Sequence, residues 1–172
     1  NLRDAMNDID KQIEITNYFR SMDELFNKYL GINIKNSYNE ASSEVERILA
    51  REVDGTRKYF MVKHKDKLIG IFYVYGYRQD YNKCNLALGL SKEYRGKGIA
   101  NILMEYMCKQ LITHGITRIG LEIESDNIYS LKSVTKLQSN LGFEREGISR
   151  NHYGIGRDCI IYSLIVKKQE RS

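Results

Sequence analysis

A basic, glycine-rich turn, Arg95-Gly96-Lys97-Gly98, contains the residues of this chain whose types and spacing best suit chemistry. It follows a short apolar run, residues 86–90, and precedes an amphipathic segment that begins at Ile99 and Ala100. A strand, a glycine turn and a helix N-terminus together favour anion binding, because unpaired N–H groups and the positive end of the helix dipole face outward. Glycine also has no Cβ to keep a phosphate from the backbone. The turn therefore predicts a phosphate site.

The spacing of the turn excludes two common phosphate motifs. It lacks the Gly-x-x-x-x-Gly-Lys-Ser/Thr of a P-loop and the Gly-x-Gly-x-x-Gly of a dinucleotide-binding fold. It does contain Arg-x-x-Gly-x-Ala, at Arg95, Gly98 and Ala100. This pattern resembles the acetyl-coenzyme A pyrophosphate loop of the GNAT acetyltransferase superfamily.

Further motifs follow in an order that narrows the resemblance. Asn127-x-x-Ser130 opens a helix, Leu141-Gly142-Phe143-x-x-Glu146-Gly147 follows, and the segment at residues 158–164 closes the series. Together they resemble the RimJ/RimL branch of the superfamily, whose members acetylate α-amines of ribosomal proteins or small amines. The match is clear from about Leu68 onward. It is looser over residues 12–55, where the family builds its acceptor specificity.

The resemblance implies roles for individual residues around bound acetyl-CoA. Backbone groups near Leu88, Gly89 and Leu90 are expected to pair with the pantetheine arm, and the Leu90 N–H to serve as an oxyanion donor. Asn127 is expected to hydrogen-bond the arm, and Ser130 to lie near the sulfur. The implied pyrophosphate ligands are Arg95, Gly96, Lys97, Gly98, Ile99 and Ala100.

The source of proton transfer stays open at this stage. Ser130 is a candidate proton donor to the thiolate, because the tyrosine that many family members use corresponds to Gln138 here. The acidic base expected after Glu146-Gly147 has no match. His152 is one candidate, since imidazole titrates near neutral pH. Glu122 and Glu124, at the end of a predicted strand, are others.

The elements that must position these residues predict one domain over residues 1–172 with a mixed α+β fold. We expect a mostly antiparallel twisted sheet with one splayed strand pair and helices on both faces. Residues 1–10 are expected to form a loose lead-in. The predicted strands are residues 12–16, 58–64, 68–75, 86–90, 117–124, 143–149 and 159–166.

Helices are expected between these strands. Ser21-Met-Asp-Glu24 reads as a capping box for the first, Gly31 as its end, and Ser42 or Ser43 as the cap of a second, after a loop at 33–39. Asp126 is expected to cap the helix before Gly142. For the helix after Gly98, the predicted buried residues are Ile99, Ile102, Leu103, Tyr106, Met107 and Leu111.

Charge and cysteine content bear on partners and compartment. The net charge is +5, which suits an anionic ligand. Residues 21–54 contain seven acidic and four basic side chains, so they carry −3 and could face a cationic acceptor. The three cysteines have no paired or metal-type spacing, so no metal site is predicted. The expected location is cytoplasmic, without a membrane partner, as a monomer or homodimer.

The sequence thus predicts an acetyl-CoA-dependent N-acetyltransferase, with direct attack by the amine of a protein or peptide N-terminus. One alternative is a small-molecule, polyamine or antibiotic N-acetyltransferase. Another is a non-catalytic acyl-CoA-binding or nucleic-acid-binding module, suggested by Gln138 and the missing base. Interleaved aromatic and basic residues at 73–81 add support for nucleic-acid binding. A nucleic-acid partner is not favoured, because strand alternation explains that pattern more simply.

Overall fold

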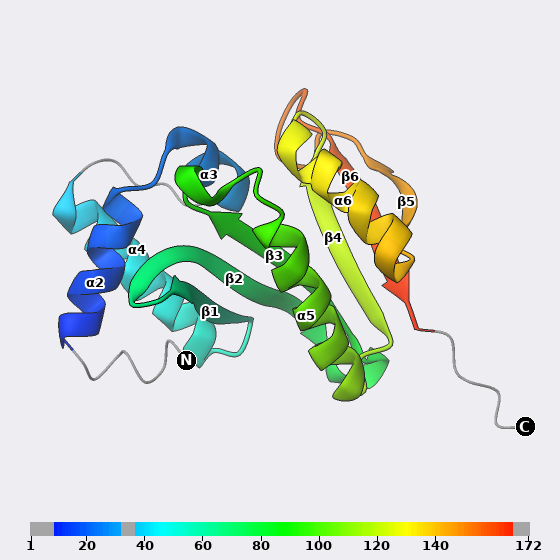
Figure 1. The fold of residues 1–172 in the computed structure, drawn as a ribbon, viewed down its shortest axis with the longest axis horizontal. Coiled ribbons are helices and arrows are strands. Elements are labelled where there is room, and N and C mark those ends of the chain that lie inside the picture. Colours follow the sequence, from blue (N-terminus) through cyan, green and yellow to red (C-terminus); the bar gives the residue numbers. More distant parts are fainter. Residues whose placement is uncertain (1–8, 32–36, 167–172) are drawn as a thin grey trace, which may run out of the picture. The chain divides into compact units, whose positions relative to one another are not determined.

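The computed structural model describes residues 9–31 and 37–166 (Figure 1). Six strands in this part form one sheet in the order β1-β2-β3-β4-β6-β5. The β3–β4 pair is parallel, whereas β1–β2, β4–β6 and β5–β6 are antiparallel. This confirms the predicted mixed α+β fold with a mostly antiparallel sheet. The strands are β1 (Arg57–His64), β2 (Lys67–Arg78), β3 (Lys83–Leu90), β4 (Arg118–Glu124), β5 (Glu144–Ser149) and β6 (Cys159–Ile165).

Helices connect these strands and precede them. The α-helices of the described part are α2 (Ile9–Arg20), α3 (Glu24–Leu30), α4 (Tyr38–Val53), α5 (Ile99–Thr113) and α6 (Ile128–Leu141). Two short 3₁₀ turns, η1 (Gln79–Tyr81) and η2 (Lys92–Tyr94), flank β3. Across the described ranges, we find no helix with the length and apolar character that crossing a membrane requires.

The chain divides into two compact units, which are described separately. The first contains the chain up to Tyr75 together with Ala87–Arg95, and the second contains Gly76–Leu86 and the chain from Gly96 onward. The single domain over residues 1–172 stays a prediction.

The first unit has a hydrophobic core between its helices and the β1–β2 hairpin. Phe19, Ile48, Tyr59 and Ile71 are almost completely buried in it, and they come from α2, α4, β1 and β2. In β2 the buried residues run without interruption from Leu68 to Tyr73, as in a strand covered on both faces. The C-terminal end of β3 belongs to this unit, and Ala87 packs against its core.

The second unit packs α5 and α6 with the strands β4, β5 and β6. Its fully buried residues include Cys84, Cys108, Ile119, Val134 and Phe143. The three cysteine thiols of the chain are free and buried. Burial raises the pKa of Cys84 to about 11 and that of Cys108 to about 12, so these thiols are unreactive packing groups at neutral pH.

The N-terminal prediction of a strand at residues 12–16 is wrong, because these residues lie within α2. The buried residues of α2 recur at helical spacing: Ile15, Thr16, Tyr18 and Phe19. The three hydrophobic ones belong to the same core as the buried residues of α4. A five-residue window was too short to separate a period of two from one of 3.6. Residues 1–8 of the expected lead-in lie outside the described residues, and the rest of it begins α2.

Three helix starts also differ from the prediction. Asp23, rather than Ser21, caps α3 by accepting a hydrogen bond from the Phe26 N–H (3.1 Å). The N-cap of α4 is Ser37, so Ser42 and Ser43 lie inside that helix. The N-cap of α6 is Asn127 rather than Asp126. In each case several polar residues adjoin the helix start, and local sequence does not select among them.

The predicted buried face of α5 is partly wrong. Met104 and Cys108 are its buried residues, whereas Ile102 and Tyr106 are 69% and 59% exposed. Apolar residues surround most of this helix, so periodicity alone could not choose the face that packs.

Candidate active site

The C-terminal end of β3 lies in the first unit, where α3 packs directly on it. A Cβ added to Gly89 would lie 2.3 Å from Leu30 Cδ1 and 2.7 Å from Phe26 Cε2. Gly89 therefore has a packing role in addition to the cofactor contact predicted for it. Leu88 precedes it in β3, and the next residue, Leu90, is buried.

The Arg95 side chain, predicted to bind pyrophosphate, is bonded within the first unit. Its Nε donates to the Leu90 carbonyl (2.8 Å), and Nη1 and Nη2 donate to the two carboxylate oxygens of Asp23 (2.7 Å each). This hydrogen-bonded guanidinium holds the pKa of Asp23 below its ordinary range. Arg95 therefore joins the strand end to the cap of α3, a link that sequence spacing did not reveal.

The remaining turn residues, Gly96–Ala100, begin the second unit and form a backbone cradle. Gly96 and Gly98 have φ angles of +72° and +79°, which side-chain-bearing residues rarely adopt. Gly98 is the N-cap of α5, and no described side chain caps that helix. Apart from the glycine's own chain neighbours, no described heavy atom lies within 4 Å of a Cβ built at either position. The turn is therefore open on the side to which a Cβ would project.

Two residues that sequence reasoning missed lock α5 to α6. Asn101 Nδ2 donates to the Ser133 carbonyl (2.9 Å), and Ser133 Oγ donates to Asn101 Oδ1 (2.6 Å). Asn101 lies in the first turn of α5, directly after the cradle. The reciprocal pair fixes the cradle relative to α6, which carries Asn127 and Ser130 at its own start.

Asn127 and Ser130 are brought together by a helix cap. Asn127 is buried, and its Oδ1 accepts a hydrogen bond from the Ser130 N–H (3.1 Å). The cap uses the amide oxygen, so the Nδ2 donor is the part of this side chain suited to a ligand. Ser130 is half-buried, and its hydroxyl belongs to the first turn of α6.

The two candidate acids on β4 have different surroundings. Glu124 is 5% exposed, and both its oxygens accept hydrogen bonds from Arg157 (2.6 and 2.8 Å). Glu122 is half-buried and accepts a hydrogen bond from Asn85 Nδ2 (3.2 Å). The Asn85 amide fits there because Gly120 has no Cβ. Glu124 is thus occupied by an ion pair, which leaves Glu122 as the better base candidate.

His152 lies in the exposed loop between β5 and β6. Its Nδ1 is 3.2 Å from Ser149 Oγ, and its ring meets that of Tyr153 edge to face. The loop is anchored to the end of β4, because the Ser125 N–H donates to the Asp158 carbonyl (2.9 Å). Gln138 lies in α6, where its carbonyl accepts the closing bond from Gly142. Within the described ranges, no group of histidine, cysteine and acidic side chains could hold a metal ion.

Comparison with known proteins identifies the family. The sequence profile of the Acetyltransferase (GNAT) family matches residues 19–137, which is more than half of the chain. This chain belongs to the GNAT acetyltransferase family. Membership confirms the predicted enzyme class, an N-acetyltransferase that uses acetyl-CoA as donor.

Relatives with curated descriptions are distant. This GNAT acetyltransferase is 27% identical over 101 residues to acetyltransferase SG1711 of Sodalis glossinidius, covering 59% of this chain and 68% of that protein. It is 30% identical over 111 residues to the N-alpha-acetyltransferase MAK3 of Arabidopsis thaliana, covering 63% of this chain and 56% of the plant protein. The match thus spans little more than half of the latter.

Solved structures share the fold at low sequence identity. A putative ribosomal-protein-serine acetyltransferase from Vibrio cholerae has a TM-score of 0.71 at 17% identity, covering 91% of this chain and 88% of that one. The ribosomal-protein-S5-alanine acetyltransferase of Vibrio fischeri has a TM-score of 0.65 at 21% identity, covering 92% and 90%. The microcin C7 self-immunity acetyltransferase MccE, in complex with acetyl-CoA and AMP, has a TM-score of 0.67 at 18% identity, covering 90% and 84%.

Proposed function

We propose that this GNAT acetyltransferase acetylates the α-amine of a protein or peptide and belongs to the RimJ/RimL-like branch. The observation that carries the proposal concerns the acidic segment at residues 21–54. A polycationic acceptor would draw on its seven carboxylates, and two of these are already paired, Asp23 with Arg95 and the buried Glu44 with Arg47. The two Vibrio structures, described as ribosomal-protein acetyltransferases, support the same choice.

The acid–base groups favour an amine that is readily neutral. The amine that attacks the thioester must be unprotonated. A peptide α-amine has a pKa of roughly 7.7–8, so an appreciable fraction is neutral at pH 7. A lysine-like amine, with a pKa of roughly 10.4, is neutral in only about one molecule in a few thousand. Arg157 pairs with Glu124, so this carboxylate is held in an ion pair and is less available to deprotonate a strongly basic amine, which fits the α-amine better.

Two backbone segments and the Asn127 side chain would hold the donor. The N–H groups of Gly96–Ala100 would bind the pyrophosphate, with Lys97 adding a full charge. Backbone groups of Leu88–Leu90 would pair with the pantetheine amides, and Asn127 Nδ2 would donate to the same arm. Bound acetyl-CoA supplies the thioester that the amine attacks. The Leu90 N–H would stabilise charge developing on the thioester oxygen, an effect of roughly 3–4 kcal/mol for a pre-aimed donor.

Proton movement is assigned to two side chains. Glu122, held by Asn85, would take the proton from the attacking amine directly or through water. The Ser130 hydroxyl would donate to the departing sulfur. His152 remains a second base candidate, although its described contacts with Ser149 and Tyr153 lie within its own exposed loop.

An acceptor panel with acetyl-CoA tests the proposal. The matched acceptors are short peptides with a free N-terminus and no lysine, the same peptides with a blocked N-terminus and one lysine, spermidine and an aminoglycoside. We expect thiol release to be fastest with the free N-termini, and mass spectrometry to place the acetyl group on the α-amine. The rate should rise with pH through the amine's own titration, near about 8.

Other outcomes identify the alternatives. Faster turnover of spermidine or the aminoglycoside than of every peptide overturns the α-amine assignment in favour of a small-molecule acetyltransferase. Binding of acetyl-CoA without turnover of any acceptor supports the non-catalytic alternative. A cytoplasmic location and a monomer or homodimer stay predictions.

A further inference from the structure

The three nitrogens of the Arg95 side chain all donate hydrogen bonds within the first unit. The Asp23 carboxylate that receives two of them also caps α3 through the Phe26 N–H. The third bond reaches the Leu90 carbonyl. A single planar guanidinium therefore fastens the start of α3 to the end of β3. Three hydrogen bonds in one plane and in fixed directions require the arginine guanidinium, because a lysine ammonium is a point charge without fixed directions.

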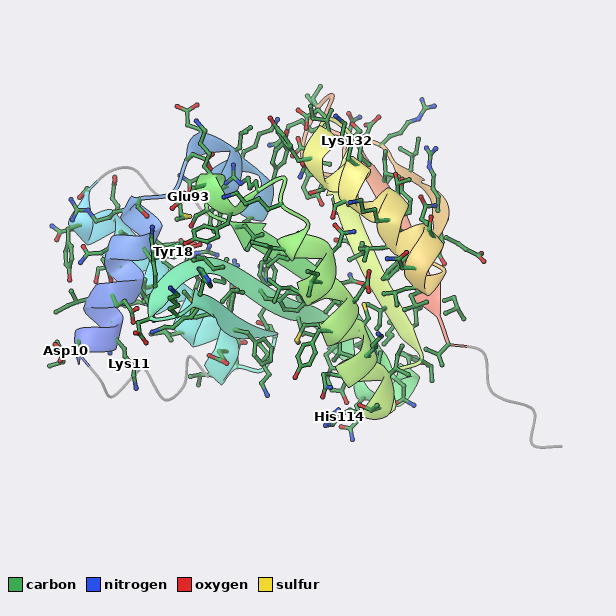
Figure 2. The ribbon with its side chains drawn as sticks, viewed as in Figure 1. Asp10, Lys11, Tyr18, Glu93, His114 and Lys132 are labelled. Atoms are coloured by element: carbon green, nitrogen blue, oxygen red, sulfur yellow. The ribbon has the colours of Figure 1, made fainter. Side chains whose placement is uncertain are left out.

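The peptide group between Leu90 and Ser91 is held at both of its polar atoms. Arg95 Nε binds its carbonyl oxygen, and its N–H, that of Ser91, donates to the Ile69 carbonyl of β2 (2.8 Å). The Ser91 side chain is buried, and its Oγ donates to the Tyr18 hydroxyl (3.4 Å). Figure 2 labels Tyr18 on α2 and Glu93 in the η2 turn that separates Ser91 from Arg95. The backbone of Leu90 thus has little freedom to rotate.

The same strand end is packed tightly by α3 and β2. Phe26 and Leu30 occupy the space where Gly89 lacks a Cβ. On β2, a Cβ at Gly70 would lie 2.8 Å from the Gly89 carbonyl oxygen. Packing and hydrogen bonds therefore converge on the peptide groups at Gly89–Ser91. This segment includes the Leu90 N–H, which is the proposed oxyanion donor.

We infer that Arg95 is a positioning residue: with Asp23 it fixes the Leu90 backbone and α3, and it does not bind the cofactor phosphate through its side chain. This inference rests on the oxyanion role proposed for the Leu90 N–H. It assigns the two charges of the Arg-Gly-Lys-Gly turn to different tasks. Arg95 shapes the strand end, and the phosphate contact is assigned to Lys97.

Acetyl-pantetheine, a shortened acetyl donor, distinguishes positioning of the strand end from binding of the pyrophosphate. Acetyl-pantetheine has the thioester and the arm but no pyrophosphate, so loss of a phosphate ligand cannot affect its turnover. We expect Arg95→Lys and Asp23→Asn each to lower kcat by about tenfold with both acetyl-CoA and acetyl-pantetheine, while the KM for acetyl-CoA changes by less than about threefold. Lys97→Gln is the matched control. It should raise the KM for acetyl-CoA and leave acetyl-pantetheine turnover unchanged.

Two further measurements distinguish positioning from a general loss of structure. The double variant Arg95→Lys/Asp23→Asn should be about as slow as either single variant, because both remove the same link. Amide hydrogen exchange at Ser91 and Phe26 should accelerate in both single variants and not in Lys97→Gln. These rates are measured with whichever amine the wild-type enzyme acetylates best, so a wrong acceptor assignment does not affect the test.

Several results would overturn the inference. One is an Arg95→Lys effect that appears with acetyl-CoA and disappears with acetyl-pantetheine. Another is a folded Asp23→Asn variant with wild-type kcat and unchanged amide exchange at Ser91. Additive losses in the double variant would likewise show that the two residues act separately.

Discussion

The segment Leu88–Ala100 is one continuous motif in sequence, yet its two halves are built differently. From Leu88 to Arg95 the backbone is held by side chains from elsewhere in the first unit: Asp23, Phe26 and Tyr18. From Gly96 to Ala100, left-handed glycines shape the backbone, and the space beside them is open. The backbone of the first half is therefore fixed by its neighbours, whereas that of the second half is open on one side. Substitutions should act through geometry in the first half and through ligand contact in the second.

The largest effect on stability is expected at Gly89 in the first half. In Gly89→Ala the new Cβ overlaps Leu30 and the buried Phe26 ring, and overpacking of this kind costs about 1–3 kcal/mol. Urea denaturation should show a lower free energy of unfolding, and kcat should fall as α3 moves. Gly147→Ala in β5 is the control, because its new Cβ meets open space and its φ is not left-handed, so that variant should lose less stability. Equal losses in the two variants would contradict the tight packing at Gly89.

The next effect concerns cofactor affinity in the second half. In Gly98→Val a branched Cβ fills the space where a phosphate would approach the N–H groups, so acetyl-CoA affinity should fall by about tenfold or more. Isothermal titration calorimetry measures it. Gly115, which follows α5 at its other end with φ +88° and open surroundings, provides the control. Gly115→Val should carry similar backbone strain and bind acetyl-CoA normally. Wild-type affinity in folded Gly98→Val would rule out the pyrophosphate assignment.

A smaller, kinetic effect is expected at the start of α6. Ser130→Ala removes a hydroxyl proposed to donate a proton to sulfur. The backbone N–H of residue 130 can still donate its hydrogen bond to Asn127 Oδ1, so the helix cap is kept. We expect a severalfold loss in kcat with little change in the KM for acetyl-CoA, because a proton donor acts mainly in the transition state. His152→Ala should change the pH–rate profile only modestly. If Ser130→Ala raises KM alone, Ser130 is a binding residue.

The last effect is absent at neutral pH and concerns the stability of each unit at alkaline pH. Burial raises the pKa of Tyr18 to about 12, although its hydrogen bond with Ser91 opposes the shift. Between about pH 10 and 12 the native state keeps this proton while the unfolded state loses it, so stability falls as pH rises. Tyr18→Phe should flatten that fall by up to about 1.4 kcal/mol per pH unit.

Cys108, whose pKa is about 12, provides the matching probe in the second unit. Cys108→Ala should flatten the fall in stability above about pH 9, measured by urea denaturation at several pH values. If the two units unfold separately, each variant should change only its own transition. A Tyr18→Phe protein with the wild-type pH dependence would show that the Tyr18 phenol ionises freely in the native state.

Much of the fold followed from the sequence. Apolar runs and alternation located the strands from β1 to β6, and Gly31 and Gly142 located the ends of α3 and α6. The errors lay where several local patterns competed. The five residues 12–16, within α2, were too few to distinguish the two-residue period of a strand from the 3.6-residue period of a helix. Helix α5 is apolar on most of its surface, so the sequence did not show which face is buried. In both, the helices and strands packed against the segment decided the outcome.

For the site, the sequence by itself indicated the glycine turn, because glycine is the residue that readily adopts the positive φ angles found at Gly96 and Gly98. It also placed Asn127 and Ser130 one helical turn apart. Only the tertiary structure decided which charged groups remain for a ligand. Arg95 and Asp23 are 72 positions apart, and Arg157 and Glu124 are 33 apart. No local pattern encodes such pairs, because the partner of a charged side chain is set by which segments the fold brings together.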